Sequence, residues 1–285
     1  MTQSDPGHDN AANYHPRHPS SKVSVMAHIT RSAKSGPDWT WNELRAYNIR
    51  IVTDNVATFF GNPDLPRPSV RQAILINEHY PIDGLPDKDD RLFFDLMKHA
   101  MLIVPEQESA VDDFTAHLLK LLGYNEPDRI VRQWVNIPLF ICGSRVPTKT
   151  DLCVIKRRLN DIVLLVQEDK RHLDQLDPEP QLIAEAIATF QRNNMRLSRM
   201  GLPTSNNMTI PGITIIGTAP TFFKISITTP LVEAVETGSY PYEATIVHKL
   251  VPPVPRLEQL EERGMGPLDN RAVILGCFEA FKQFI

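Results

Sequence analysis

Charged side chains stand at the ends of two very apolar runs in the middle of the chain. The run at residues 162–167 is hydrophobic enough for a strand buried on both faces, yet it finishes in three charges at positions 168–170. The preceding run, residues 152–155, opens on another acid, Asp151. Two carboxylates can hold Mg²⁺, which prefers oxygen ligands, and the ion lowers the pKa of a bound water. A nearby lysine can stabilise developing negative charge. These residue types therefore suit metal-dependent hydrolysis of a phosphodiester.

Whether the acids meet depends on how the two runs pair. Glu168 and Lys170 share one face of their strand, about 7 Å apart, because side chains alternate along a strand. If the runs form an antiparallel hairpin with an even loop, Asp151 shares a face with Val166, Glu168 and Lys170 and lies opposite or diagonal to the last two. An odd loop would need a bulge to restore this arrangement. We expect Asp151 and Glu168 to share one cation, with Lys170 beside it.

The elements that carry these residues follow from the hydrophobic periodicity. Apolar residues at helical spacing predict a helix that ends at Gly123. Pro178 and Gly201 suit the first turn and the end of a long amphipathic helix. The predicted strands lie at residues 131–145, 150–156, 161–170, 212–217, 221–228 and 242–251. The order of helix, three strands, helix and further strands indicates an α/β or α+β fold, with a central mixed sheet flanked by helices.

The chain divides into three parts by its composition. Residues 1–38 are rich in Pro, Ser, Asn and His and poor in large aliphatic side chains, which predicts a disordered tail. Residues 39–104 predict a helical extension packed on the core. Its first two short helices are expected to bury Trp39, Trp41 and Phe59–Phe60. Residues 105–285 predict the main domain, which two C-terminal helices complete.

The overall composition is that of a globular protein able to bury a core. The chain has 285 residues, of which 42% are hydrophobic and 22% charged, and its formal net charge is −4. Affinity for nucleic acid must therefore come from a local patch. Three cysteines in apolar surroundings fit a reducing compartment. No apolar stretch reaches the roughly 20 residues of a membrane span, and the N-terminus lacks the apolar core of a signal peptide. We expect an intracellular protein of the nucleus or cytoplasm without a membrane partner.

Asp151, then Glu168-x-Lys170 at the end of the next apolar strand, then an amphipathic helix, resembles the PD-(D/E)XK, or restriction-endonuclease-like, nuclease superfamily. The resemblance covers about residues 105–230, and the style of the chain is similar to that of nuclease-like proteins of fungi. The chain departs from the family at Thr150, where a proline is usual. The resemblance implies a restriction-endonuclease-like core with helical additions at both ends.

The resemblance also implies an activity. A PD-(D/E)XK-type phosphodiesterase hydrolyses nucleic acid with Mg²⁺ or Mn²⁺, and we expect DNA in preference to RNA. Asp151 and Glu168 would ligate the ion, and Lys170 would assist the attacking water. Two alternatives belong to other classes of function. One is a catalytically silent nuclease fold that binds nucleic acid or protein, and the other is a structural domain whose charges are incidental.

Residues from two helices would complete such a site. The helix before the sheet often supplies another acid in this family, and Glu108 fits because its spacing places it on the apolar face. As a helix-start acid Glu108 would instead complement the helix dipole. Asp112 is expected at the surface, although it could substitute for Glu108 in another helix register. The helix after the sheet often carries a polar residue that faces the site, and Gln181 or Glu185 fits that position.

Basic residues concentrate around the acidic motif. Between residues 145 and 172, seven Lys and Arg oppose four Asp and Glu, so the local charge is +3 in a chain of net charge −4. The candidate nucleic-acid contacts are Arg145, Lys149, Arg157, Arg158 and Arg171. A further stripe on the long helix consists of Arg192, Arg196 and Arg199. This stripe either contacts phosphates or is a solvated face whose cations favour the helix C-terminus.

Overall fold

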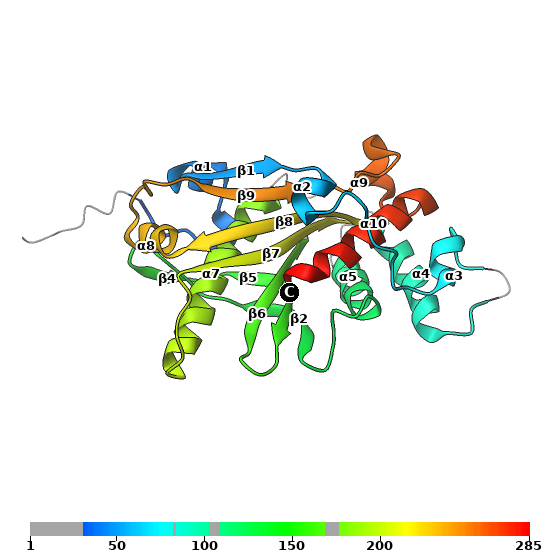
Figure 1. Cartoon of the computed structure of the whole chain (residues 1–285), viewed down its shortest axis with the longest axis horizontal. Coiled ribbons are helices and arrows are strands. Elements are labelled where there is room, and N and C mark those ends of the chain that lie inside the picture. The colour runs from blue at the N-terminus through cyan, green and yellow to red at the C-terminus, as the bar shows by residue number, and fades with distance from the viewer. Residues whose placement is uncertain (1–30, 82–83, 103–108, 169–176) are drawn as a thin grey trace, which may run out of the picture.

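A seven-stranded mixed sheet forms the centre of the protein (Figure 1). The computed structural model describes residues 31–81, 84–102, 109–168 and 177–285. The strands are β1 (Ile49–Thr53), β2 (Arg129–Asn136), β3 (Leu139–Ile141), β4 (Ser144–Val146), β5 (Lys149–Lys156), β6 (Asp161–Glu168), β7 (Asn207–Ile216), β8 (Ala219–Thr228) and β9 (Thr245–Leu250). The main sheet has the order β1-β9-β8-β7-β6-β5-β2, and β3 pairs with β4 in a separate hairpin.

Helices precede, connect and follow these strands. They are α1 (Trp41–Ala46), α2 (Val56–Phe60), α3 (Gln72–Ile76), α4 (Lys88–Ala100), α5 (Ser109–Leu121), α7 (Pro178–Arg199), α8 (Thr229–Thr237), α9 (Leu260–Arg263) and α10 (Leu268–Phe281), with 3₁₀ turns η1 (Gly36–Asp38), η2 (Leu257–Gln259) and η3 (Lys282–Phe284). The longest helix, α7, begins where Asp177 accepts a hydrogen bond from the Glu179 amide, with Pro178 in its first turn. In the described part of the chain, every helix is too short or too polar to cross a membrane.

The strand directions make the sheet mixed. β6 and β7 run parallel, as do β1 and β9, whereas the other neighbours in the main sheet are antiparallel. Parallel neighbours need a crossover connection, and α7 supplies it between β6 and β7. The prediction of a central mixed sheet flanked by helices is confirmed.

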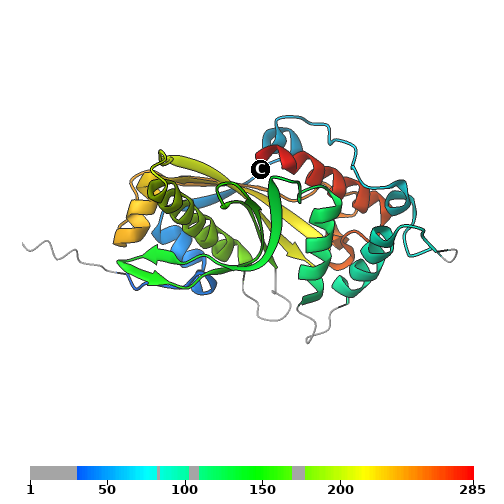
Figure 2. The ribbon, with the colours of Figure 1, turned by 90° about the horizontal axis from the view of Figure 1, so that it is seen from below.

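The sheet separates two hydrophobic cores. On one face, Cys153 and Leu165 pack with Ile183 of α7. On the other face, Leu152 and Val166 belong to the core that includes α5 and α10. Figure 2 shows α7 and α5 on either side of the strands. Because strand side chains alternate between faces, β5 and β6 must be apolar at nearly every position, which explains their unbroken hydrophobic runs.

Two strand predictions in the first half of the chain were wrong. The extension expected to be helical also contributes β1, which joins the main sheet beside β9. The single strand expected at residues 131–145 is β2 followed by the β3–β4 hairpin. The chain turns there because Cys142 (φ 48°) and Gly143 (φ 72°) adopt left-handed backbone conformations.

The start of the chain differs from expectation at two points. Of the tail predicted at residues 1–38, residues 1–30 lie outside the described residues. Its last part is ordered, because residues 36–38 form η1 and the Gly36 amide donates to the Pro147 carbonyl. Trp39 is buried as expected, whereas the side chain of Trp41 is 43% exposed. The Trp41 indole donates to Asp177, so its polar edge meets the N-cap of α7.

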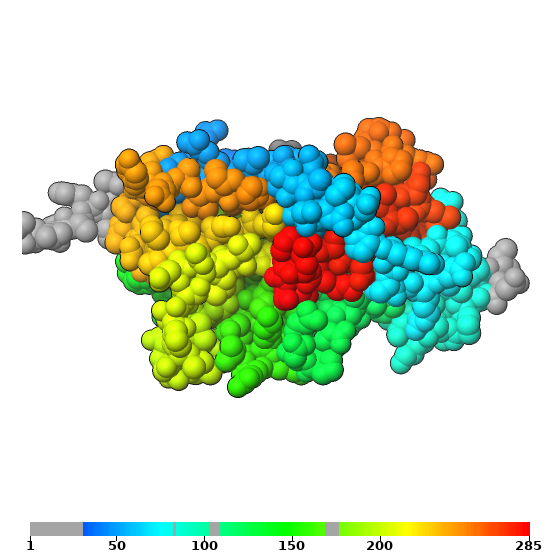
Figure 3. Space-filling model, in the orientation of Figure 1, coloured from blue at the N-terminus to red at the C-terminus, as the bar shows by residue number. Residues whose placement is uncertain are grey.

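Arg271 of α10 anchors the N-terminal extension. Its side chain is fully buried. Its guanidinium donates to the backbone carbonyls of Ile74, Asn77, Glu78, Met265 and Gly266. Burial lowers the pKa of Arg271 to about 10, so the side chain is still charged at neutral pH. In Figure 3 the C-terminal residues (red) lie against segments of the extension (blue to cyan), as this hydrogen bonding requires.

Replacing Arg271 with methionine should lower the free energy of unfolding by about 3–5 kcal/mol, because several buried carbonyls lose their donor. Chemical denaturation measures this loss. Arg263→Met is the matched control, since Arg263 lies 4.0 Å from Glu78 but is partly exposed, and its removal should cost less than about 1 kcal/mol. Equal losses in the two variants would contradict the anchoring role.

Candidate functional site

The β5–β6 hairpin contains a bulge that the sequence did not reveal. Near the turn, Ile155 pairs with Ile162, but the next pair along the ladder is Val154 with Leu164. Val163 is therefore an extra residue in β6. Such a bulge shifts every pair beyond it by one residue.

Helix α7 stabilises the hairpin beside this bulge. The side-chain amide of buried Asn193 accepts from the Ile162 amide (3.2 Å) and donates to the Ile162 carbonyl (2.9 Å). Arg192 donates to the Asn160 carbonyl and Arg196 to the Leu159 carbonyl, both in the turn. Two of the three arginines in the predicted stripe thus bind the hairpin turn of their own chain.

The bulge decides what faces Asp151. The ladder pairs Leu152 with Val166, which brings Asp151 level with Gln167 instead of Val166. The loop is even, as the hairpin prediction required, but the prediction that Asp151 shares a face with Val166 and Glu168 was wrong. Asp151 lies on the face of Gln167, and the Glu168 side chain belongs to the opposite face of the sheet. The carboxylate of Asp151 accepts from the Gln167 side chain (2.7 Å) and from the Glu168 amide (2.9 Å). Asp151 and Glu168 therefore meet through a side chain and a backbone group.

The ladder on the other side of Asp151 is also interrupted. Pairing of β2 with β5 passes from Gln133–Leu152 to Val135–Thr150 and omits Trp134, which has a left-handed φ of 53°. On the β2 side Asp151 thus lies where the ladder is interrupted, whereas the β5–β6 ladder next to it is regular. A residue released from regular pairing can direct its carboxylate to the end of the sheet, and bulges often serve this purpose next to active sites.

Thr150 occupies the position where the resemblance suggests a proline. Its hydroxyl lies 2.8 Å from the Leu152 carbonyl and 3.1 Å from the Val166 carbonyl. The hydroxyl therefore links β5 to β6 immediately before Asp151. Proline has no side-chain donor for this contact, so the departure from the family pattern has a structural reason here.

Helix α7 brings a second acid to Asp151. Glu185 is completely buried, and its carboxyl accepts from the Gln181 side chain (3.1 Å). Burial raises the pKa of Glu185 well above its usual value, the negative charge of Asp151 raises it further, and hydrogen bonding with Gln181 and Thr150 opposes the shift. Both residues proposed for the helix position, Gln181 and Glu185, thus belong to one hydrogen-bonded pair.

Two buried acceptor atoms in this cluster have no hydrogen-bond partner among the described residues. They are Oε2 of Glu185 and Oε1 of Gln167. An oxygen that accepts hydrogen bonds is costly to bury alone, and a proton, a water molecule or a cation relieves that cost. Together with the Asp151 carboxylate, the cluster offers the oxygen donors that hard divalent cations prefer.

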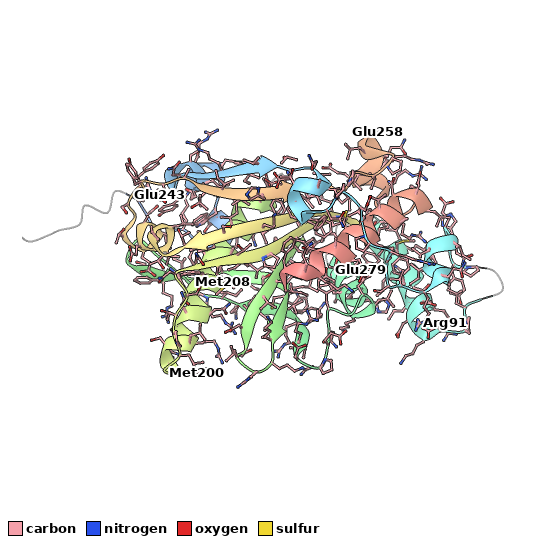
Figure 4. All side chains as sticks on the ribbon, viewed as in Figure 1. Arg91, Met200, Met208, Glu243, Glu258 and Glu279 are labelled. Atoms are coloured by element: carbon pink, nitrogen blue, oxygen red, sulfur yellow. The ribbon has the colours of Figure 1, made fainter. Side chains whose placement is uncertain are left out.

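A cleft of about 250 Å³ opens at the same end of the sheet. One of its walls is Thr214 of β7, the register partner of Gln167. Glu179 at the start of α7 and Lys249 of β9 form an ion pair in the lining. Glu258, labelled in Figure 4, contributes an acid from η2. The cleft lies outside the carboxyl ends of parallel β6 and β7, where open α/β sheets commonly bind ligands.

Some predicted site residues are not covered by the structure. Glu108, Lys170 and Arg171 lie outside the described residues, so their roles stay predictions. Asp112 is described and is buried, contrary to the expected surface position, with the Trp134 indole donating to its carboxylate (3.2 Å). Within the described ranges, no three His, Cys, Asp or Glu side chains are grouped so that they could hold a metal ion.

The basic residues are more dispersed than their sequence positions suggest. Arg157 and Arg158 follow Lys156, the last residue of β5. Lys156 is five residues from Asp151, so the strand separates the two arginines from Asp151 by about 17 Å. Their predicted contact with nucleic acid stays a prediction, at a distance from the acids. Lys149 is close to Asp151 in β5, and its ammonium lies 5.2 Å from the centre of the Trp134 ring.

Arg145 has a different setting. It lies in β4 and lines a groove between the β3–β4 hairpin, α7 and α8. Of the predicted nucleic-acid contacts that the structure describes, Lys149 is therefore the one nearest to Asp151 along the chain.

Comparison with known protein families gives no matching family model, and no curated protein matches the chain. The chemistry of the site must therefore be argued from its own residues.

Changing Glu185 to glutamine should flatten the pH dependence of stability in the metal-free protein. The pKa of Glu185 is raised in the folded state. Its contribution to the free energy of unfolding is therefore fully present below the unfolded pKa near 4.5 and is lost as pH rises through the folded pKa. Glu185→Gln should therefore gain stability relative to the unmodified protein as pH increases. Urea unfolding in chelator between pH 4 and pH 8 measures the difference, with exposed Glu243→Gln as the control. Parallel pH profiles for all three proteins would contradict this prediction.

Proposed function

We propose that the protein is a metal-dependent nuclease of the PD-(D/E)XK type, which hydrolyses phosphodiester bonds and acts on DNA in preference to RNA. The observation that carries the proposal is the capture of the Glu168 amide by the Asp151 carboxylate at the end of the β5–β6 hairpin. This contact holds the first acid of the motif beside the strand end that bears the second acid.

The order of the elements supports the proposal. The resemblance expects a helix, a strand that opens on Asp151, a strand that ends in Glu168 and an amphipathic helix facing the site. In the structure α5 precedes β2, β5 and β6, and α7 follows them and directs Gln181 and Glu185 to the cluster.

The oxygen atoms of the cluster are of the type that a hard divalent ion, Mg²⁺ or Mn²⁺, prefers as ligands. Asp151 and Glu168 would ligate it at the end of the hairpin, where their side chains leave opposite faces of the sheet, with Glu108 as an auxiliary ligand. The buried oxygens of Gln167 and Glu185 lie in the same cluster and make it rich in acceptors. When bound, the ion supplies polarisation of the phosphate and a lower pKa for an attached water.

The chain's own groups would position the reaction. The Gln167 side chain and the Glu168 amide both donate to Asp151, which restricts the orientation of its carboxylate. Lys170 would orient the attacking water and offset the charge that develops on the phosphate oxygens. Lys149 could contact a neighbouring phosphate as a point charge.

Cleavage of a supercoiled plasmid tests the proposed activity. Nicking should require Mg²⁺ or Mn²⁺, and Asp151→Asn and Lys170→Ala should each reduce its rate by about 100-fold or more. The side-chain amide oxygen introduced by Asp151→Asn can still accept from the Glu168 amide, so this variant should fold and melt at or above the temperature of the unmodified protein. A higher melting temperature would indicate that the substitution relieves repulsion between acids.

The controls use the same residue types away from the site. Lys156→Ala at the other end of β5 and exposed Asp128→Asn should leave nicking unchanged. Nucleic-acid binding without metal-dependent cleavage would reject the enzyme and favour a silent nuclease fold that acts as a binding module. Equal cleavage by all variants would assign the activity to a contaminant or to another site.

A further inference from the structure

The two edges of the main sheet differ in how they are protected. At one edge, β2 carries Arg129 and Arg132, and the left-handed conformation of Trp134 interrupts its regular course. At the other edge, β1 pairs with β9 in an unbroken parallel register over all five residues, without a bulge or a proline. Bulges, charges and prolines are the usual devices that prevent strand addition at an edge. In the described part of the chain, β1 has only one charged residue, Arg50.

The direction of the free backbone groups on β1 follows from its bonds to β9. The Asn48 carbonyl accepts from the Thr245 amide (2.9 Å), and the Asp54 amide donates to the Lys249 carbonyl (2.8 Å). Because a strand bonds the same parallel neighbour at alternate residues, these even-numbered positions face β9. The N–H and C=O groups of the odd-numbered positions therefore point away from the sheet. These positions are Ile49, Ile51 and Thr53.

We propose that β1 is a dimerisation edge, which pairs antiparallel with β1 of a second copy of this chain about a two-fold axis through Ile51. Ile51 then faces the partner's Ile51, and Ile49 faces the partner's Thr53. The outward N–H groups of each copy meet the outward C=O groups of the other. One continuous sheet results, and the exposed edge is closed on both copies at once.

The sequence of β1 suits a second copy of itself. In this register Arg50 lies opposite the partner's Val52, so the two arginines do not face each other. Val52 is 44% exposed, and Ile246, the neighbour of Arg50 on β9, is 36% exposed. Ile49 and Val247 pack in the core on the α7 side of the sheet. Because side chains alternate along a strand, Val52 and Ile246 stand on the opposite face. Pairing would bring this exposed apolar surface together across the axis.

Paired substitutions of Val52 test the geometry without disturbing the monomer, since its side chain is partly exposed and packs in neither core. Val52→Arg places an arginine opposite the partner's Arg50 twice per dimer, and Val52→Glu places a carboxylate there twice. Sedimentation equilibrium over a range of concentrations measures the dimer Kd. Val52→Arg should raise it about tenfold, and Val52→Glu should lower it by a similar factor that declines with added salt.

Hydrogen exchange on the full chain provides the second measurement. Raising the concentration through the dimer Kd should slow exchange of the Ile51 amide, which points outward, and leave the Val52 amide, already bonded to β9, unchanged. A protein that stays monomeric at all concentrations would overturn the proposal. A dimer whose Kd is equal in both Val52 variants would overturn it as well, because association would then use another surface. Neither result would bear on the nuclease activity.

Discussion

The bulge in β6 is the constraint on which the candidate site depends. It shifts the β5–β6 register by one residue, so that Asp151 is level with Gln167 instead of Val166 and accepts from the Gln167 side chain and the Glu168 amide. Asn193 satisfies both backbone groups of Ile162 beside the bulge, which would otherwise be costly to bury. The long helix that crosses from β6 to β7 therefore also sets the geometry of the acids.

The same helix creates an electrostatic cost at the other end of the hairpin. Glu185 is buried close to Asp151, and desolvation and like charge both oppose its ionisation by raising its pKa. A purely structural domain gains little from two acids in such a position, since an apolar pair of similar volume would pack without this penalty. A site that takes up a cation turns the same arrangement into binding energy. This contrast is the physical reason to favour a metal-dependent function over an incidental cluster.

Most elements of the core could be predicted from the sequence, because periodicity and caps are local signals. The apolar runs identified β5 and β6 as doubly buried strands, and Pro178 and Gly201 marked the limits of α7 to within two residues. The register could not be predicted, since the bulge is stabilised by Asn193, about 30 residues further along the chain. Nor could the distance of Arg157 and Arg158 from the acids be predicted, because residues close in sequence lie at opposite ends of a strand. β1 was missed because a short edge strand between two helices has a weak alternating pattern.

The most direct test of the central claim is the anomalous scattering of Mn²⁺ in crystals of the protein. The account predicts a peak about 2.0–2.2 Å from a carboxylate oxygen of Asp151, with Glu168 as a second ligand, that disappears in Asp151→Ala crystals. A Mn²⁺-soaked crystal with no peak at Asp151, or with a peak that persists in Asp151→Ala crystals, would contradict it.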